Sequence, residues 1–168
     1  IIFEQAAVGV ALCDTESGNY IGVNQRYCDI VGYTPEEIKQ LSFKKITHPE
    51  DIKEDLENMT LLLEGKIREF SIKKRYYHKD GSIVWVKLTV SPMWKKGEKP
   101  TSHIAIVEDI TKNKRKESVQ LAQLNLVECA QTHSVNELLQ RFLDEAEALT
   151  DSKIGFYHFL EDDQQTLM

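Results

Sequence analysis

The sequence predicts an α+β fold, with five antiparallel strands in one sheet and the helices on one of its faces. Three observations lead to this prediction. Two long runs of alternating apolar and polar residues, at 69–77 and 82–92, flank the turn dipeptide Asp80-Gly81. Helical patterns with clear start signals cluster between residues 24 and 65, ahead of this hairpin. A last apolar run, 103–109, gives way abruptly to a charged helical segment, so the expected order is β-β-α-α-α-β-β-β.

The elements at the N-terminus are short. Residues 8–14 and 19–24 read as two strands joined by a turn, and residues 1–7 predict the end of a short helix. Asn24 stands where a helix N-cap belongs, and Gly32 supplies a C-terminal stop. A helix is therefore expected between these two residues.

Two further helices are indicated by their first residues. Thr34 can cap the first, Pro35 fits its first turn, and Glu37 completes a Thr-x-x-Glu capping box. The second is expected to open at Pro49 and to close at Gly65. Its predicted apolar stripe consists of Ile52, Leu56, Met59 and Leu63.

From Thr111 to about His133 the pattern is again helical, and its first turn, Lys112–Lys116, is strongly basic. Ser134 can cap a further helix. Residues 153–168 read as a strand, an acidic turn and the start of a returning strand, which is too little to close a core. The helix that begins at Thr111 has heptad spacing at Val119, Ala122, Leu126 and Cys129, which favours pairing with a second helix.

The composition is that of an ordinary soluble globular protein. The 168 residues carry a net charge of −6, and acidic and basic residues are interspersed, which argues against a nucleic-acid partner. The longest apolar run, Ala6–Cys13, is too short to span a bilayer. Three cysteines are too few for a disulfide framework or a zinc site, so a reducing, cytosolic setting is expected. Since the sequence begins in mid-pattern without a Met, we expect a piece of a longer protein.

No catalytic arrangement is recognisable in the sequence. It contains no glycine-rich phosphate loop, no GxSxG elbow and no HExxH motif. The five histidines lack metal-ligand spacing, and acid pairs such as Glu36-Glu37 stand at helix starts. We therefore expect neither an enzymatic activity nor a metal site in this segment.

Residues 1–111 resemble a PAS domain along nearly their whole length. Six short matches occur in the order and at the spacing of that family, and the order of elements deduced above agrees with the PAS fold. The matches are Gly9, Asn24, Gly32–Glu37 (GYTPEE), His48–Asp51 (HPED), Lys79–Ser82 (KDGS) and Asp109–Thr111 (DIT), the last closing a PAC motif.

Residues from about 130 to 168 resemble the opening of a GAF domain, in "LLQRFLDEAEALT" followed by "SKIGFYHFLEDDQQTL". The resemblances imply a PAS domain at 1–111, a linker helix at 112–133 and a truncated GAF segment at 134–168. PAS followed by GAF is the arrangement of multidomain bacterial sensors, most often histidine kinases. The phospho-accepting and ATP-binding boxes of such kinases are absent from this segment, as is the signature of a diguanylate cyclase.

The resemblance implies a sensory and dimerisation module of a two-component signal-transduction protein. A pocket ligand or a partner would shift the sheet, and the step Asp109-Ile110-Thr111 would pass the change to the linker helix. There Asp109 can accept an ion pair, Ile110 can insert into the edge of the fold, and Thr111 can cap the helix. A homodimer through the linker and N-terminal helices is expected. The alternative is a ligand-free protein–protein interaction scaffold.

A ligand of a PAS domain would lie between the sheet and the helices, in a space that a packed core can also fill. The helix at 51–64 contains no His, so the usual axial ligand of haem-binding PAS domains has no counterpart; His48 precedes the helix. The Asn-Cys-Arg motif of cysteinyl-flavin photosensors is absent, and Cys13 and Cys28 are expected as small core residues. The identity of any cofactor stays open. By periodicity, the pocket-facing residues are Val10, Leu12, Tyr27, Ile30, Val31, Phe43, Ile46, Leu56, Met59 and Leu63.

Overall fold

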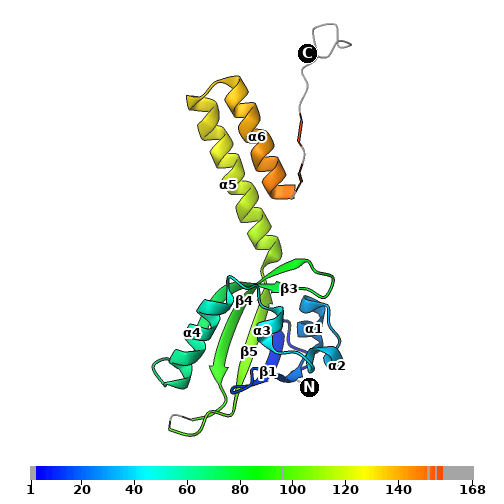
Figure 1. Cartoon of the computed structure of the whole chain (residues 1–168), viewed down its shortest axis with the longest axis vertical. Coiled ribbons are helices and arrows are strands. Elements are labelled where there is room, and N and C mark those ends of the chain that lie inside the picture. Colours follow the sequence, from blue (N-terminus) through cyan, green and yellow to red (C-terminus); the bar gives the residue numbers. More distant parts are fainter. Residues whose placement is uncertain (1–2, 96, 151, 154, 157–168) are drawn as a thin grey trace. The chain divides into compact units, whose positions relative to one another are not determined.

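The chain divides into two compact units, residues 1–112 and 113–168. The first holds the sheet and four helices, α1 to α4, and the second holds most of α5 and all of α6 (Figure 1). The computed structural model describes residues 3–95, 97–150, 152–153 and 155–156. Its elements are β1 (Gly9–Asp14), β2 (Tyr20–Val23), α1 (Gln25–Val31), α2 (Pro35–Ile38), α3 (Phe43–Ile46), α4 (Ile52–Leu63), β3 (Phe70–Tyr77), β4 (Ile83–Pro92), β5 (Ser102–Asp109), α5 (Thr111–Thr132) and α6 (Val135–Thr150).

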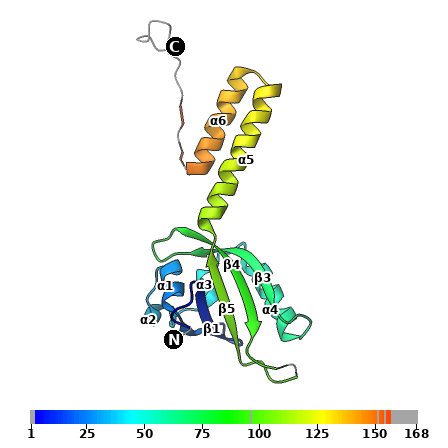
Figure 2. The same ribbon diagram turned by 180° about the vertical axis from the view of Figure 1, so that it is seen from behind.

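The five strands form one antiparallel sheet in the order β2-β1-β5-β4-β3. The first and last strands of the unit, β1 and β5, are paired at its centre. The predicted hairpin is present, with Tyr77 opposite Ile83 and with Gly81 at a φ of +89° in the turn, a conformation that glycine adopts without steric cost. Helices α1 to α4 cover one face of the sheet (Figures 1 and 2). The predicted α+β class and five-stranded antiparallel sheet are confirmed.

The helix caps read from the sequence are present. Oδ1 of Asn24 accepts the N–H of Tyr27, and Gly32 ends α1 at a φ of +77°. Thr34 and Glu37 form the reciprocal capping box of α2, with bonds of 3.0 and 3.3 Å. These helix ends need only neighbouring residues, which explains why sequence pattern found them.

Two features of the helical layer differ from the expectation. The structure has four helices between β2 and β3 instead of three, because residues 43–46 form the one-turn helix α3. The helix expected to open at Pro49 begins at Ile52. The carboxylate of Asp51 does not cap it but binds the backbone N–H and the guanidinium of Arg75 on β3. The start of α4 is therefore set by a contact with the sheet.

The helix expected over residues 1–7 is wrong for residues 3–7, which form a turn and a bend before β1. The buried amide of Asn24 explains the difference. Its Nδ2 donates to the carbonyl oxygens of Phe3 at 2.9 Å and of Val8 at 3.0 Å. These carbonyls are satisfied by a side chain instead of by the amides of a following helical turn.

In the second unit, α5 and α6 lie side by side as a helical hairpin (Figures 1 and 2). Nδ2 of Asn125 donates to Oε1 of Glu145 across them at 2.9 Å. Ser134 caps α6 as expected, and Glu137 accepts its backbone N–H at 2.8 Å. Among the described helices, none is both long and apolar enough to cross a membrane. Most of the strand pattern predicted over 153–168 lies outside the described residues.

Candidate functional site

A buried ion pair lies between the sheet and the helices of the first unit. Nζ of Lys74 on β3 pairs with the carboxylate of Asp55 on α4, and the two side chains are 1% and 2% exposed. The ammonium also donates to Oγ1 of Thr47 at 3.3 Å and lies 4.7 Å from the ring centroid of Tyr76. Burial lowers the pKa of Lys74, and the attraction of Asp55 opposes this shift. Two charged groups thus stand where apolar side chains are usual.

Neutral polar groups surround this pair. The hydroxyls of Tyr20 and Tyr27 are 2.7 Å apart, and burial raises the pKa of both well above the ordinary range. Nδ1 of His103 on β5 lies 3.1 Å from Oγ1 of Thr15, and burial lowers the pKa of this imidazole. Burial raises the pKa of the Cys13 thiol to about 12, which makes it a poor nucleophile near neutral pH. The charge in this part of the core therefore comes from Lys74 and Asp55.

A cavity of about 20 Å³ adjoins the ion pair. A space of this size holds about one water molecule. Lys74, Asp55 and His103 form the polar part of its wall, and Met59 closes it from α4. The other walls are formed by Cys13, Phe43, Tyr76, Leu88, Val90 and Ala105.

Most of the residues predicted to face the pocket are buried in the core between sheet and helices. Two of them, Phe43 and Met59, line the cavity itself. The buried set is Tyr27, Ile30, Val31, Phe43, Ile46 and Met59.

The prediction is wrong for Leu56 and Leu63, which are 37% and 43% exposed. Helix α4 instead turns Asp55, Met59 and Leu62 towards the core. Met59 belongs to both rows, whereas Leu56 and Leu63 are each replaced by the residue before them, which corresponds to a helix rotation of about 60°. The ion pair with the sheet favours this rotation, because a buried carboxylate needs a partner.

The prediction is also wrong for Val10 and Leu12. Successive side chains of a strand point to opposite faces of the sheet. Ala11 and Cys13 belong to the core cluster, whereas Leu12 and the buried Val10 do not. Because residues 8–13 are apolar or glycine throughout, their sequence pattern does not identify the inward face.

Sequence reasoning missed Lys74 and Asp55 as core residues. The alternation of the strand could have indicated the lysine, since Lys74 occupies the same buried row of β3 as Phe70, Ile72 and Tyr76. A lone lysine or a lone helical aspartate is ordinarily a surface residue. The pair becomes recognisable only when α4 and β3 are brought together.

The joint between β5 and α5 is formed by Asp109, Ile110 and Thr111. Oδ1 of Asp109 accepts the N–H of Thr111 at 2.9 Å. Oγ1 of Thr111 accepts the N–H of Trp85 on β4 at 3.0 Å and donates to the Trp85 carbonyl at 3.4 Å. The same carbonyl accepts the N–H of Ile110 at 2.9 Å. The capping role expected of Thr111 is thus taken by Asp109, and the Thr111 hydroxyl fastens the start of α5 to β4.

Trp85 connects this joint to the start of α4. Its ring lies 5.4 Å from the guanidinium of Arg75 on β3. Nη2 of Arg75 binds Asp51 at 2.6 Å and Glu50 at 2.8 Å. Hydrogen bonds from the Arg75 side chain hold the pKa of Asp51 below its usual range. A chain of contacts within the first unit therefore runs from Asp51 through Arg75 and Trp85 to Thr111.

Helix α5 carries apolar side chains on two sides. The heptad residues Val119, Ala122 and Leu126 line an apolar groove to which α6 also contributes. In the described part of the chain, α6 thus lies along the side of α5 that carries the heptad pattern. Another side of α5 is uncovered, where Leu121, Leu124 and Val127 are 60%, 67% and 57% exposed.

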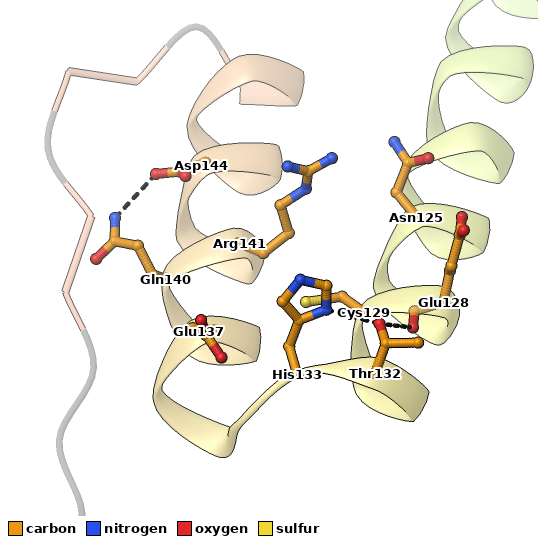
Figure 3. A pocket seen from close by; sticks show the side chains of 9 residues that line it. All are labelled: Asn125, Glu128, Cys129, Thr132, His133, Glu137, Gln140, Arg141 and Asp144. Carbon is orange, nitrogen blue, oxygen red and sulfur yellow. Dashed lines mark hydrogen bonds between the residues drawn. The ribbon is translucent and has the colours of Figure 1, made fainter.

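A second groove between α5 and α6 is polar and open, with a volume of about 450 Å³. Figure 3 shows Cys129, His133 and Arg141 near one another between the helices. Gln140 and Asp144 bind each other along α6 at 2.9 Å instead of pointing to a common centre. Within the described residues, no three His, Cys, Asp or Glu side chains could hold a metal ion. The groove therefore offers no convergent set of ligating groups.

The fold and the joint define this protein as an α+β domain whose last strand continues directly into helix α5. Residues 20–107 match the family model described as PAS fold. The match covers more than half of the chain, and the chain therefore belongs to the PAS family.

Two relatives extend the comparison beyond the fold. The probable diguanylate cyclase DgcE of Escherichia coli (strain K12) is 40% identical over 116 residues, which are 69% of this chain and 10% of that protein. The sensor histidine kinase TmoS of Ectopseudomonas mendocina is 29% identical over 137 residues, which are 81% of this chain and 14% of that protein. The chain thus spans only a small part of these relatives.

Solved structures share the fold at low sequence identity. The PAS domain of a protein from Colwellia psychrerythraea has a TM-score of 0.60 and 22% identity, covering 66% of this chain and 92% of that one. A sensory box histidine kinase/response regulator from Burkholderia thailandensis also has a TM-score of 0.60, with 19% identity over 76% of this chain and 95% of that one. These likenesses show the PAS fold alone.

Proposed function

We propose that this chain is a sensory and dimerisation module of a cytosolic signal-transduction protein, without catalytic activity of its own. A change in the PAS core passes to α5 through Asp109, Ile110 and Thr111. The observation that carries the proposal is the hydroxyl of Thr111, which binds both backbone groups of Trp85. A displacement of β4 at Trp85 therefore moves the first residue of α5.

The geometry of α4 supports the same route. Asp51 stands at the start of this helix and is held by Arg75, and Arg75 in turn lies against Trp85. Because Asp55 and Met59 of the same helix form part of the cavity wall, a molecule that alters the cavity also displaces α4. The route thus connects the core to the joint through charged and aromatic side chains.

The names of the two relatives support a sensor histidine kinase or a related regulator as the parent protein. In this proposal residues 1–111 end in a PAC motif, 112–133 are the linker helix and 134–168 open a GAF domain. A second copy pairs with α5 through Leu121 and Leu124, whose exposed apolar side chains favour burial in a dimer.

We call this route from Asp51 through Arg75 and Trp85 to Thr111 the relay. It is tested by two substitutions combined with hydrogen–deuterium exchange of α5. Asp51→Asn weakens the contact with Arg75 at one end of the route, and Thr111→Val removes the hydroxyl at the other. We expect Asp51→Asn to accelerate amide exchange in the first two turns of α5 by about threefold or more. In the Thr111→Val background the same substitution should have no further effect, because the route is already interrupted.

Glu37→Gln is the matched control. It removes an exposed ion pair with Lys79, whose Nζ lies 2.6 Å from the carboxylate, and it keeps a side chain that serves in a capping box. Exchange in α5 should stay at the wild-type rate in this variant. An equal effect of Asp51→Asn in both backgrounds, or none in either, would refute the relay.

A ligand-free interaction scaffold is the second candidate, and the small size of the cavity favours it. In that case the PAS core only aligns two protomers. Native mass spectrometry of the purified chain distinguishes the two functions. A co-purified small molecule supports the sensor, whereas a bare chain that dimerises without changes in α5 exchange supports the scaffold.

A further inference from the structure

Two ion pairs hold α4 on β3, and one of them is buried beside the cavity. The adjacent residues Lys74 and Arg75 bind Asp55 and Asp51, which lie one helical turn apart. The Arg75 pair is partly exposed, but the Lys74 pair is almost completely buried. Apolar side chains of similar volume often stabilise a core at least as well as a buried ion pair does. The buried charges therefore call for an explanation other than packing.

We propose that the cavity is the closed form of a binding site for a small zwitterion, an α-amino acid with a short apolar side chain, which inserts between Lys74 and Asp55. The inference rests on the proposed sensory function and names its ligand class. The carboxylate of the ligand binds Lys74 and the Thr47 hydroxyl, and its ammonium group binds Asp55. The apolar walls that receive its side chain are formed by Met59, Leu88, Val90 and Ala105.

Charge balance selects a zwitterion over simpler ligands. A molecule that separates Lys74 from Asp55 must give each of them a new partner, because an unpaired charge in the core is strongly unfavourable. An anion would leave Asp55 unpaired, and a cation would leave Lys74 unpaired. His103 and Cys13, which also line the cavity, do not supply a replacing charge, since burial favours their neutral forms. A ligand with both charges keeps the core neutral.

The dimensions of the cavity restrict the size of the ligand. The closed space of about 20 Å³ holds about one water molecule, so an amino acid enters only when a wall moves. Helix α4 is the wall suited to move, because Leu56 and Leu63 on its outer side are exposed. Met59 adds adaptability through its unbranched, flexible side chain. The site therefore suits small side chains such as those of alanine and valine.

Insertion of the ligand also acts on the start of the relay. The backbone N–H of Asp55 donates to the carbonyl oxygen of Asp51, so the two carboxylates belong to the same turn of backbone. Moving Asp55 away from Lys74 shifts Asp51 against Arg75. The ligand thus alters the contact from which the proposed route to Thr111 starts.

Isothermal titration calorimetry of the whole chain with L-valine and its two halves tests the ligand class. Isovalerate is valine without the ammonium group, and isobutylamine is valine without the carboxylate. We expect L-valine to bind with a dissociation constant in the millimolar range or below, and each half to bind at least about tenfold more weakly. Isovalerate binding as tightly as valine would overturn the zwitterion. A lack of saturable binding by glycine, L-alanine and L-valine would overturn the site.

Paired substitutions test the residues. Asp55→Leu with Lys74→Met removes both charges together and should abolish the heat of valine binding. Lys53→Met with Glu57→Leu removes an exposed pair on the same helix and should leave it unchanged. Asp55→Asn is a second variant that removes the charge with little change of shape, and it should weaken binding at least about tenfold. Undiminished binding in either core variant contradicts the proposal.

Failure of this inference is distinguishable from failure of the relay. If no amino acid binds but Asp51→Asn still accelerates α5 exchange only when Thr111 is present, the ligand class is wrong and the relay stands. If valine binds through Lys74 and Asp55 without changing α5 exchange, the site stands and the relay is wrong.

Discussion

At the scale of single residues, Asn24 joins three segments through one side chain. Its Oδ1 accepts the N–H of Val10 at 2.8 Å and of Tyr27 at 2.9 Å. Its Nδ2 donates to the carbonyls of Phe3 and Val8, and the residue is 0% exposed. Helix capping accounts for the bond to Tyr27 alone. The other bonds make Asn24 a structural centre of the N-terminal half of the domain.

Asn24→Ala should destabilise the domain by about 3 kcal/mol, because several buried backbone groups lose their partner at once. Thr34→Ala, which removes an exposed cap, should cost about 1 kcal/mol. Urea unfolding followed by tryptophan fluorescence measures both, since Trp85 and Trp94 are the two tryptophans of the sequence and lie in the first unit. Similar losses in the two variants would contradict a special role for Asn24.

His103 should make stability depend on pH. Burial lowers its pKa, whereas the unfolded chain binds the proton near pH 6.5. Between these two pKa values the unfolded state holds more protons, so stability rises with pH. The contribution is fully present above about pH 6.5 and is lost as the pH falls through the folded pKa. His103→Gln should flatten the pH dependence of the unfolding free energy below about pH 6.5, and an unchanged pH profile would disprove this assignment.

At the scale of elements, α4 owes its orientation to the sheet. Its sequence places Leu56 and Leu63 where an apolar stripe is expected, yet Asp55 and Leu62 face the core instead, beside Met59. The energetic reason lies in Lys74, whose place in the buried row of β3 requires a carboxylate opposite. The rotation of this helix is therefore decided by the strand it covers.

A double-mutant cycle should show strong coupling between α4 and β3. Lys74→Met or Asp55→Leu alone leaves one buried charge unpaired and should cost about 3–5 kcal/mol. The double variant should lie within about 2 kcal/mol of the wild type, because both charges have gone. Urea unfolding of the four proteins gives the coupling energy. Additive losses would mean that the two residues do not depend on each other.

The contact between α1 and the β3–β4 hairpin depends on a glycine. Gly32 has a φ of +77°, and a Cβ atom there would overlap the imidazole of His78. The N–H of Lys79 donates to the carbonyl of Val31 at 2.9 Å, which holds the hairpin against the end of α1. Gly32→Ala should lower the free energy of unfolding by about 2–3 kcal/mol. Gly81→Ala, at a similar φ but in open space, should lower it by about 1 kcal/mol. Equal losses in thermal or urea unfolding would argue against the close packing at Gly32.

At the scale of the whole molecule, the chain combines a domain with its own core and a helical hairpin that leaves apolar surface uncovered. The first unit buries its apolar side chains between sheet and helices. In the second unit, no residue of α6 is buried, and on α5 Ala122 is the buried residue. Exposed side chains such as Leu121 and Leu124 therefore remain available to a second copy of the chain.

Leu124→Lys should weaken dimerisation by about tenfold or more, because it places two ammonium groups in the proposed interface. Leu63→Lys, at an exposed position of α4, should leave it unchanged. Sedimentation equilibrium of the whole chain measures both dissociation constants. A wild-type chain that stays monomeric at high concentration would count against the dimer.

The sequence by itself determined the order of the five strands, the place of the helices between the second and third of them, the caps at Asn24 and Thr34, the turn at Gly81 and the start of α5. These features depend on residues within one or two turns of each other, so local pattern is sufficient to predict them. Only the tertiary structure decided which face of β1 is buried, how α4 is rotated, how the joint is fastened to β4, and which residues form the ion pair. Each of these depends on groups distant in sequence, as in Lys74 with Asp55 and Thr111 with Trp85. Their energy arises only when the fold removes both partners from water.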